Sequence, residues 1–248
     1  MSKCILMTGT QGCVGSRLKD IFIKKGYHVT EFHGDIRFPG AWENYKTMKW
    51  DGLIHLAAIA GVRRSFEEPE EYYDNNVNGT IEALKFADKF CNKMLYASSS
   101  NAYEWWGNPY AATKKMCEVA ATDYNAKGMR FHTVWPGRDD MLYRNLQKGN
   151  VTYINENHYR DYIHREDLCE GIFTIYENYD RISEKVLDIG TGHAVHVASV
   201  AKLMGFEGEY RSENPQGERV HTKANIEYLL NLGWTPERNI LDVNSHTE

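Results

Sequence analysis

The sequence predicts an α/β fold in which helices cover both faces of a doubly wound parallel sheet. Short apolar runs alternate with segments of helical periodicity through the first half of the chain, and this alternation is typical of a parallel sheet. The first apolar run ends in a glycine-rich turn that opens into a helix, as in the first βα unit of such folds. The 248 residues can bury one large core and a small second lobe.

The expected elements follow from where each periodic pattern starts and stops. In the first half of the chain we expect strands at residues 4–9, 28–32, 51–58, 93–100 and 130–135, and helices at residues 14–26, 78–90 and 110–128. Beyond Arg138 we expect pieces of the small lobe, namely a strand at residues 184–190 and helices at residues 197–205 and 224–233. We therefore assign residues 1–137 mainly to the sheet domain and residues 138–248 mainly to the small lobe, interwoven with it.

Charge and cysteine content limit the class of protein. The formal net charge of -5 is spread without blocks, which disfavours nucleic acid and anionic membranes as partners. Nowhere does the sequence show the roughly 18 uninterrupted apolar residues of a membrane span. The five cysteines are widely spaced and form no C-x-x-C pair, which suits free thiols in a reducing compartment. We expect a cytoplasmic protein.

The glycine turn predicts a dinucleotide site. "TGTQGCVG" places Gly9, Gly12 and Gly15 between the first strand and the first helix. A dinucleotide needs a tight turn, a close backbone approach to its pyrophosphate and the amide donors of a helix N-terminus. The backbone from Gly9 to Gly15, including Cys13 and Val14, is therefore the expected phosphate cradle. A purely structural turn is the alternative.

The stretch "YASSSNAYEWWGNPYAATKK" predicts the reactive groups. Ser99 ends a strand, and Lys114 follows Tyr110 by one helical turn on the same helix face. A phenol acts as a base near neutrality only when nearby positive charges stabilise its anion, and Lys114 supplies one such charge. Ser99 can donate and accept a hydrogen bond at a substrate hydroxyl, with Ser100 as a second candidate. Taken alone, the Tyr-x-x-x-Lys pair would more often be a surface pair.

Several segments together resemble the extended short-chain dehydrogenase/reductase superfamily, in particular its nucleotide-sugar epimerases and dehydratases. These are the glycine turn, "HLAAIAGVRRSFEEPEEYYDNNVNGT" and the Ser99, Tyr110 and Lys114 set. The resemblance implies a Rossmann-type fold, a tightly held NAD whose oxidised ring adds a second positive charge near the phenol, and that set as the catalytic triad. The further cofactor contacts that it implies are Asp35 and Ile36 beside the adenine, Leu56, Ala57 and Ala58 at a strand end, Arg63 near the phosphates, and Asn76, with Tyr110 and Lys114 at the nicotinamide.

The chain departs from the family pattern in two places. By count, His33 stands where such folds carry an acid for the adenosine ribose, and a strand-helix unit between it and Asp35 is missing. NAD is still favoured over NADP, because the similar enzymes hold NAD. The segment between Ser99 and Tyr110 is also shortened. Trp105 and Trp106 then either form an abbreviated lid over the sugar or pack under a tight turn.

The downstream segments indicate the sugar nucleotide. "RDYIHREDLCEGI" resembles the segment whose arginine, here Arg160, binds the diphosphate of a UDP-sugar. "RFHTVWPGRDDM" resembles the UDP-glucuronate 4-epimerases, which implies that Thr133 and Arg138 bind a uronate carboxylate. Alternatively, Arg138 pairs with Asp139 or Asp140. Substrate contacts are then expected from Ser99, Ser100, Thr133, Arg138 and Arg160.

Other activities on the same scaffold stay open. They are 4-epimerisation of UDP-glucose and UDP-galactose, decarboxylation of UDP-glucuronate, and dehydration or reduction of a nucleotide sugar. Decarboxylases and dehydratases normally carry an acid where this chain has Asn101. We expect no metal, because His193 and His196 lack a third ligand nearby in sequence. The resemblance also allows a homodimer.

Overall fold

The computed structural model describes residues 3–245 and contains a six-stranded parallel sheet with the order β2-β1-β3-β4-β5-β9. Its strands are β1 (Cys4–Thr8), β2 (His28–Glu31), β3 (Gly52–His55), β4 (Met94–Ser99), β5 (Lys127–Phe131) and β9 (Val186–Ile189). The β1 side chains Ile5, Leu6 and Met7 are fully buried, because helices cover both faces of the sheet. The predicted fold class is confirmed.

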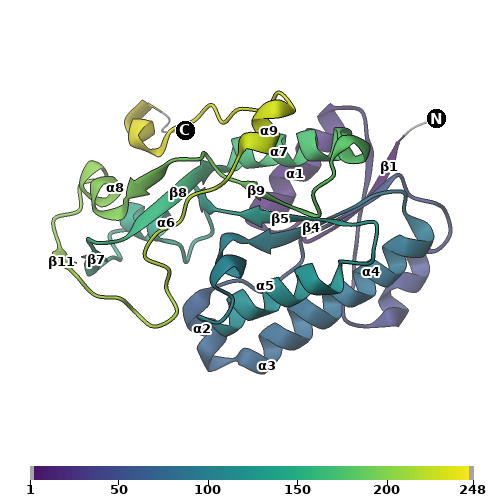
Figure 1. Cartoon of the computed structure of the whole chain (residues 1–248), viewed down its shortest axis with the longest axis horizontal. Coiled ribbons are helices and arrows are strands. Elements are labelled where there is room, and N and C mark those ends of the chain that lie inside the picture. The colour runs from purple at the N-terminus through teal and green to yellow at the C-terminus, as the bar shows by residue number, and fades with distance from the viewer. Residues whose placement is uncertain (1–2, 246–248) are drawn as a thin grey trace.

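Two helical layers enclose the sheet (Figure 1). Helices α1 (Cys13–Lys24) and α7 (Arg165–Glu177) pack together on one face. Helices α4 (Gly79–Phe90) and α5 (Pro109–Ala120) cover the other face. Phe22 of α1 packs edge-on against Tyr27, Phe173 and Tyr176, and such aromatic contacts fix α1 against α7.

The strand order places the candidate site. From β1 the chain moves outward to β2 and then crosses back to β3 on the other side of β1. Ligands of doubly wound sheets bind at this kind of switch point, outside the carboxyl ends of the strands. Gly9 follows β1, Leu56 follows β3 and Ser100 follows β4, so the predicted residues gather at this edge.

The trimmed strand-helix unit leaves β2 at the edge of the sheet. The 3₁₀-helix η1 (Pro39–Tyr45) lies in the connection from β2 to β3. Its Tyr45 hydroxyl accepts a hydrogen bond from the His33 N–H at 2.8 Å and donates one to the Glu31 carbonyl at 3.4 Å. One side chain thus satisfies two edge groups that a further strand would otherwise bond.

The small lobe contains two short sheets. One holds β6 (Thr133–Trp135), β8 (Tyr159–His164) and β10 (Ala194–His196), and the other holds β7 (Tyr153–Asn155) and β11 (Glu209–Arg211). Its helices are α6 (Leu142–Gln147), α8 (Val197–Leu203), α9 (Glu227–Asn231) and η5 (Ile240–Ser245). The remaining short helices are α2 (Val62–Glu67), α3 (Pro69–Tyr72), η2 (Tyr73–Asn78), η3 (Ser100–Glu104) and η4 (Tyr179–Arg181).

Three element predictions need correction. The helix expected at residues 110–128 ends at Ala120, and Lys127 already begins β5. The strand expected at residues 130–135 is two strands, because β5 pairs with β4 while β6 pairs with β8 in another sheet. The strand expected in the small lobe at residues 184–190 is β9, the edge of the main sheet. Helix α7 was not predicted.

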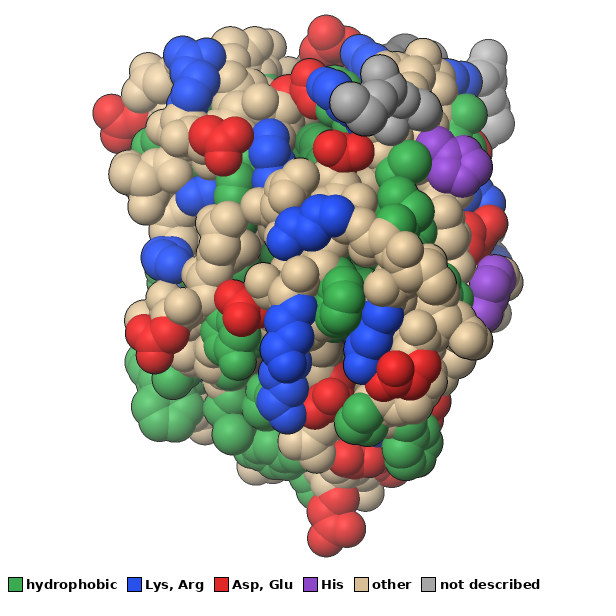
Figure 2. Space-filling model, turned by 90° about the vertical axis from the view of Figure 1, so that its right-hand side faces the viewer, with side chains coloured by type: hydrophobic (Ala, Val, Ile, Leu, Met, Phe, Trp, Pro, Cys, Tyr) green, Lys and Arg blue, Asp and Glu red, His purple; other side chains and the backbone are tan. Residues whose placement is uncertain are grey.

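The surface in Figure 2 carries both signs of charge, with Lys and Arg side chains beside Asp and Glu. In residues 3–245, helices are all too short or too polar to cross a membrane. The same described residues hold no cluster of three or more His, Cys, Asp or Glu that could bind a metal ion.

Candidate active site

The glycine turn has the geometry of a phosphate cradle. Gly9 has φ 72°, and a Cβ added to it would lie 2.6 Å from the Ala57 nitrogen. A Cβ on Gly15 would lie 2.1 Å from the Gly9 carbonyl oxygen. The Gly12 N–H donates to the Gly9 carbonyl at 3.0 Å and closes the turn. The first-turn amides of α1, those of Cys13 and Val14 included, face the turn without intrahelical acceptors. Only glycine fits at positions 9 and 15, and the cradle suits a pyrophosphate.

An acid does stand at the end of β2, contrary to the sequence interpretation. Glu31 is the last residue of β2, and its carboxylate accepts hydrogen bonds from Thr10 of the glycine turn at 2.5 Å and from Lys19 at 3.0 Å. These hydrogen bonds, that of Thr10 first, lower the pKa of Glu31. His33, the residue that counting placed there, is exposed. The expected strand was one residue too long, so the count passed Glu31.

The predicted adenine contacts have other partners in the structure. Both oxygens of Asp35 accept hydrogen bonds from the Arg37 guanidinium, which lower the pKa of Asp35. The Ile36 side chain is buried and lies where a Cβ on Gly79 would meet it, at 2.5 Å. It therefore packs against the start of α4.

Asn76 fixes the segment that follows β3. Its side chain accepts from the Ile59 N–H at 2.8 Å and donates to the Ile59 carbonyl at 2.9 Å and to Thr113 of α5 at 3.1 Å. Thr113 in turn donates to the Tyr110 carbonyl at 2.8 Å.

On the other side of this segment, the Thr8 hydroxyl accepts hydrogen bonds from the N–H groups of Leu56 and Ala57. The Leu56–Ala58 segment is thus fixed between the glycine turn and the helix that carries Tyr110.

The structure brings together the elements that carry the predicted reactive set. Ser99 ends β4, and α5, which carries Tyr110 and Lys114, packs against β4 and η3. The buried Lys114 Nζ donates to the Ala97 carbonyl at 3.0 Å and lies 6.0 Å from the centre of the Tyr110 ring. The Ser99 hydroxyl accepts hydrogen bonds from the Asn101 N–H and the Asn101 side-chain amide, at 3.2 and 3.3 Å.

A buried ion pair joins α5 to the sheet. Glu118 of α5 accepts two hydrogen bonds from Arg130, both at 2.7 Å, and one from Ser98 at 2.7 Å. Burial alone would raise the pKa of Glu118, but these hydrogen bonds hold it below its ordinary value. The pair ties the helix to the strands β4 and β5.

Trp105 and Trp106 follow η3 and form an edge-to-face pair, 48% and 70% exposed. They are not buried under the turn. Nearby, the Asn108 side chain donates to the Gly217 carbonyl at 2.9 Å, so this shortened segment contacts the loop that follows β11.

Arg138 is paired with Asp140. Its Nε and Nη2 donate to the two Asp140 carboxylate oxygens at 3.0 and 2.9 Å. Burial would lower the pKa of Arg138, yet Asp140 and the nearby Tyr110 and Tyr72 raise it. Thr133 opens β6 and pairs with Tyr162 in register.

Arg63 and Arg160 converge on one carboxylate that the sequence did not single out. Glu218 lies 3.0 Å from Arg63 Nη2 and 3.9 Å from Arg160 Nη2. Arg160 also donates to the carbonyls of Tyr159 and Val220. The neighbouring Arg219 donates to the Ser100 carbonyl at 2.7 Å. The two arginines, from different lobes, thus share one carboxylate, and Arg219 lies next to Ser100. No local pattern marked Glu218 or Arg219, because their partners are far away in sequence.

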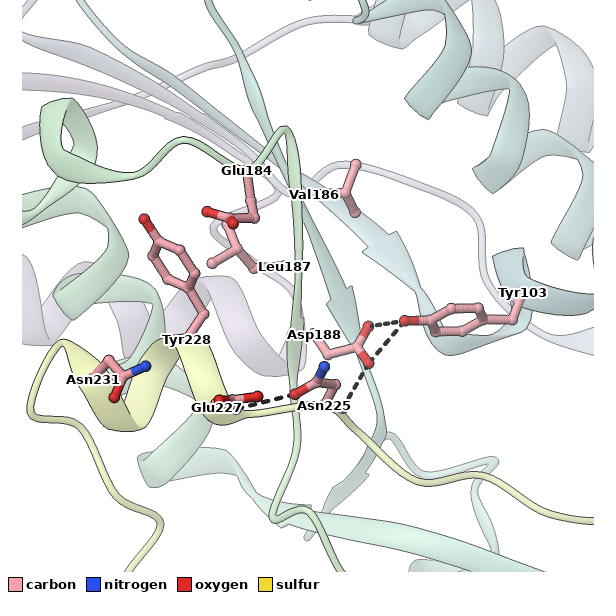
Figure 3. Close-up of a pocket in the computed structure, with 9 residues that line it drawn as sticks. All are labelled: Tyr103, Glu184, Val186, Leu187, Asp188, Asn225, Glu227, Tyr228 and Asn231. Atoms are coloured by element: carbon pink, nitrogen blue, oxygen red, sulfur yellow. Dashed lines mark hydrogen bonds between the residues drawn. The ribbon is translucent and has the colours of Figure 1, made fainter.

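A separate pocket of about 350 Å³ lies at the edge strand β9 (Figure 3). It is lined by Tyr103, Glu184, Val186, Leu187, Asp188, Asn225, Glu227, Tyr228 and Asn231. In Figure 3 the Tyr103 hydroxyl points at Asp188 and donates to its carboxylate at 3.1 Å. The predicted site residues do not line this pocket. Tyr103 instead anchors η3, which follows Ser99, to the edge of the sheet.

Comparisons with known proteins agree with this geometry. Residues 5–138 match the model of the NAD dependent epimerase/dehydratase family. The chain is 28% identical to Protein CapI of Staphylococcus aureus, across 96% of this chain and 95% of that protein. It is 26% identical to a UDP-glucuronate 4-epimerase of Thermodesulfobacterium geofontis, across 75% of each. The structure of MoeE5 in complex with UDP-glucose and NAD superposes with a TM-score of 0.83 at 25% identity, covering 96% of this chain and 95% of that chain.

The family model covers more than half of the chain, and it includes the glycine turn, the Asn76 segment, the predicted reactive set and Arg138. The protein therefore belongs to the NAD-dependent epimerase/dehydratase family, and NAD is its cofactor.

Proposed function

We propose that the protein is a nucleotide-sugar 4-epimerase that converts UDP-glucuronate into UDP-galacturonate through a transient 4-keto sugar. The observation that carries this proposal is the position of the Arg138 guanidinium, which borders Gly61 together with Tyr72, whose ring packs against Tyr110. A tyrosine base would act on a sugar hydroxyl, and an arginine can bind a carboxylate at two points. The pair therefore fits a sugar that carries both groups. The likeness to the UDP-glucuronate 4-epimerase of Thermodesulfobacterium geofontis supports the same substrate.

Tyr110 is the proposed base. It takes the proton from the hydroxyl on the sugar's fourth carbon and later returns it. The ammonium of Lys114, on the same helix, stabilises the phenolate. The Ser99 hydroxyl already accepts two hydrogen bonds from Asn101, so its own proton is available for donation to the sugar oxygen. When bound at the glycine turn, NAD would accept the hydride from the sugar, and its reduced form would return it.

The carboxylate has to be restrained during the reaction. A 4-keto uronate is a β-keto acid, which loses carbon dioxide when the bond to the carboxylate aligns with the carbonyl π system. Arg138 and Thr133 are the proposed restraints on that bond. Asn101, beside Ser99, is neutral and supplies no acid or base for decarboxylation or elimination. This favours an epimerase over a decarboxylase or dehydratase.

The diphosphate is proposed to bind near Arg160, with Arg219 close to it. Arg63, which the resemblance assigns to the cofactor phosphates, is proposed to face the substrate diphosphate instead, because it shares Glu218 with Arg160. Arg160 and Arg63 both contact the carboxylate of Glu218. A diphosphate carries more negative charge than one carboxylate, so it should bind these guanidinium groups more strongly.

A second candidate function, epimerisation of UDP-glucose and UDP-galactose, is favoured by one observation. Asp140 occupies the Arg138 fork and offsets its charge, which would make a neutral hexose acceptable. Proton NMR of the products separates the candidates. UDP-glucuronate should yield UDP-galacturonate with all carbon retained. A UDP-pentose product would reject the proposal, and brisk UDP-glucose epimerisation without reaction of UDP-glucuronate would establish the second candidate.

A further inference from the structure

Tyr72 is a buried tyrosine next to the proposed base. It ends α3, and its side chain is 0% exposed. Its ring packs edge-on against Tyr110, with the ring centres 6.2 Å apart and an interplanar angle of 81°. Its backbone N–H donates to the Glu68 carbonyl at 3.3 Å. The ring is therefore held in one place against the reactive helix.

The Tyr72 hydroxyl has no hydrogen-bond partner among residues 3–245. Buried hydroxyls almost always have one, because a polar group taken from water without a partner costs free energy. Burial raises the pKa of Tyr72, so the phenol keeps its proton and is a hydrogen-bond donor at neutral pH. This donor is fixed, uncharged and has no acceptor in this structure.

Gly61 shows where the hydroxyl lies. A Cβ built on Gly61 would be 3.4 Å from Tyr72 Oη and 4.0 Å from Arg138 Nη2. Gly61 has φ 127°, which side-chain-bearing residues rarely adopt. A neutral O–H donor and a cationic N–H donor thus border the same point. A carboxylate offers two charged oxygens to these donors, whereas a hydroxymethyl group offers one neutral oxygen, which accepts weaker hydrogen bonds.

We propose that Tyr72 donates a hydrogen bond to the exocyclic carboxylate of the bound hexuronate, beside Arg138, and is a specificity-determining residue of this site. The inference rests on the proposed function and extends it. Arg138 has an exposed, charged fork that Asp140 can occupy. Tyr72 adds a donor that Asp140 does not engage in this structure.

The test measures binding to the NAD-bound full chain, in a Tyr110→Phe background so that the ligand is not consumed. Calorimetry measures the affinities for UDP-glucuronate, UDP-glucose and UDP. The single variant Tyr110→Phe is compared with the double variant Tyr72→Phe/Tyr110→Phe. The double variant should bind UDP-glucuronate roughly tenfold to a hundredfold more weakly, as expected for a hydrogen bond to a charged group. The affinity for UDP-glucose should fall by less than about threefold, and the affinity for UDP should not change. The melting temperature should stay the same or rise, because the substitution removes an unpartnered hydroxyl.

A matched control is Tyr179→Phe, in the same background. The buried Tyr179 hydroxyl donates to the Asn125 carbonyl at 2.8 Å, so this variant should melt at a lower temperature and keep the same ratio of affinities. Unchanged UDP-glucuronate affinity in the double variant, or equal weakening for all three ligands, overturns the role of Tyr72. Turnover of UDP-glucuronate by the unsubstituted protein tests the proposed function separately. A protein that turns over UDP-glucose but does not bind UDP-glucuronate would overturn both.

Discussion

Both carboxylate oxygens of Asp140 lie against the guanidinium of Arg138, 3.0 Å from Nε and 2.9 Å from Nη2. This is the two-point contact that a uronate carboxylate would make with an arginine. An internal carboxylate and the proposed substrate carboxylate therefore compete for one fork. The pair is partly exposed, and exposed pairs are weak, so a ligand can displace Asp140 at small cost.

Removing the competing carboxylate should favour uronate binding. We expect Asp140→Asn to lower the KM for UDP-glucuronate by about twofold to fivefold, the range for an exposed ion pair, and not to lower the KM for UDP-glucose. Steady-state kinetics on both substrates measure this. The neighbouring Asp139 pairs with Lys148 instead, so Asp139→Asn is the matched control and should change neither value. A higher KM for UDP-glucuronate in Asp140→Asn would mean that Asp140 positions Arg138.

Removing the guanidinium should have the opposite effect. We expect Arg138→Ala to reduce kcat/KM for UDP-glucuronate, because a charge-assisted contact with the carboxylate is lost. The lost transition-state stabilisation should be on the order of 2 kcal/mol. UDP-glucose should be affected much less. Competition between the two substrates in one NMR tube compares the losses directly. Equal losses on both substrates would assign Arg138 a structural role.

Tyr110→Phe should abolish turnover and leave NAD bound. The substitution keeps the ring that packs against Tyr72 and removes only the proton acceptor. The glycine turn and the Asn76 contacts do not involve the phenol. Chromatography of the cofactor released on denaturation measures NAD, and NMR measures turnover. Near-normal activity would remove Tyr110 as the base, and loss of NAD would mean that the variant disturbs the cofactor site.

The parts of the site that could be predicted from the sequence are those set by local spacing. Tyr110 and Lys114 lie one turn apart on one helix, and the glycine turn is closed within a few residues. Glu31 was missed because its place depends on the register of β2 against β1, where Met7 pairs with Glu31, and that register cannot be counted along one chain.

Contacts distant in sequence were also beyond prediction. Glu218 meets Arg63, a residue 155 positions earlier, and a single acid in a polar segment carries no periodic signal. Helix α7 was missed although its buried face packs on α1. Its first three residues, 165–167, are all charged, so the sequence gives no clear helix start.

Glu31 should contribute to the choice of NAD over NADP. Its carboxylate lies at the glycine turn, where an acid binds ribose hydroxyls and disfavours a 2′-phosphate. We expect Glu31→Ser to shift the ratio of bound NADP to bound NAD upward by about tenfold, since a nearby like charge is removed. The protein would be unfolded and refolded with an equimolar mixture, and the bound cofactors extracted and quantified. Glu43, an exposed acid that pairs with Lys46, gives the control Glu43→Ser. An unchanged ratio would show that Glu31 only braces the turn.

His164 should make the stability of the protein depend on pH. It caps α7 by accepting a hydrogen bond from the Glu166 N–H at its Nδ1, at 3.2 Å, which requires that nitrogen to be unprotonated. Burial, and then the nearby Arg238, lower the pKa of His164 from 6.5 to about 4. Between these two values the unfolded chain binds a proton that the folded protein does not. The stabilisation is therefore complete above pH 6.5 and is lost as the pH falls toward 4.

The variant His164→Asn tests this contribution, because asparagine is also a good cap and does not titrate. Urea unfolding at pH 7, 5.5 and 4.5 gives the free energy of unfolding of both proteins. Other buried groups such as His55 titrate in both and cancel in the difference. We expect the unsubstituted protein to lose more stability than the variant over this range. Parallel curves would show that His164 binds its proton equally well in the folded and unfolded states.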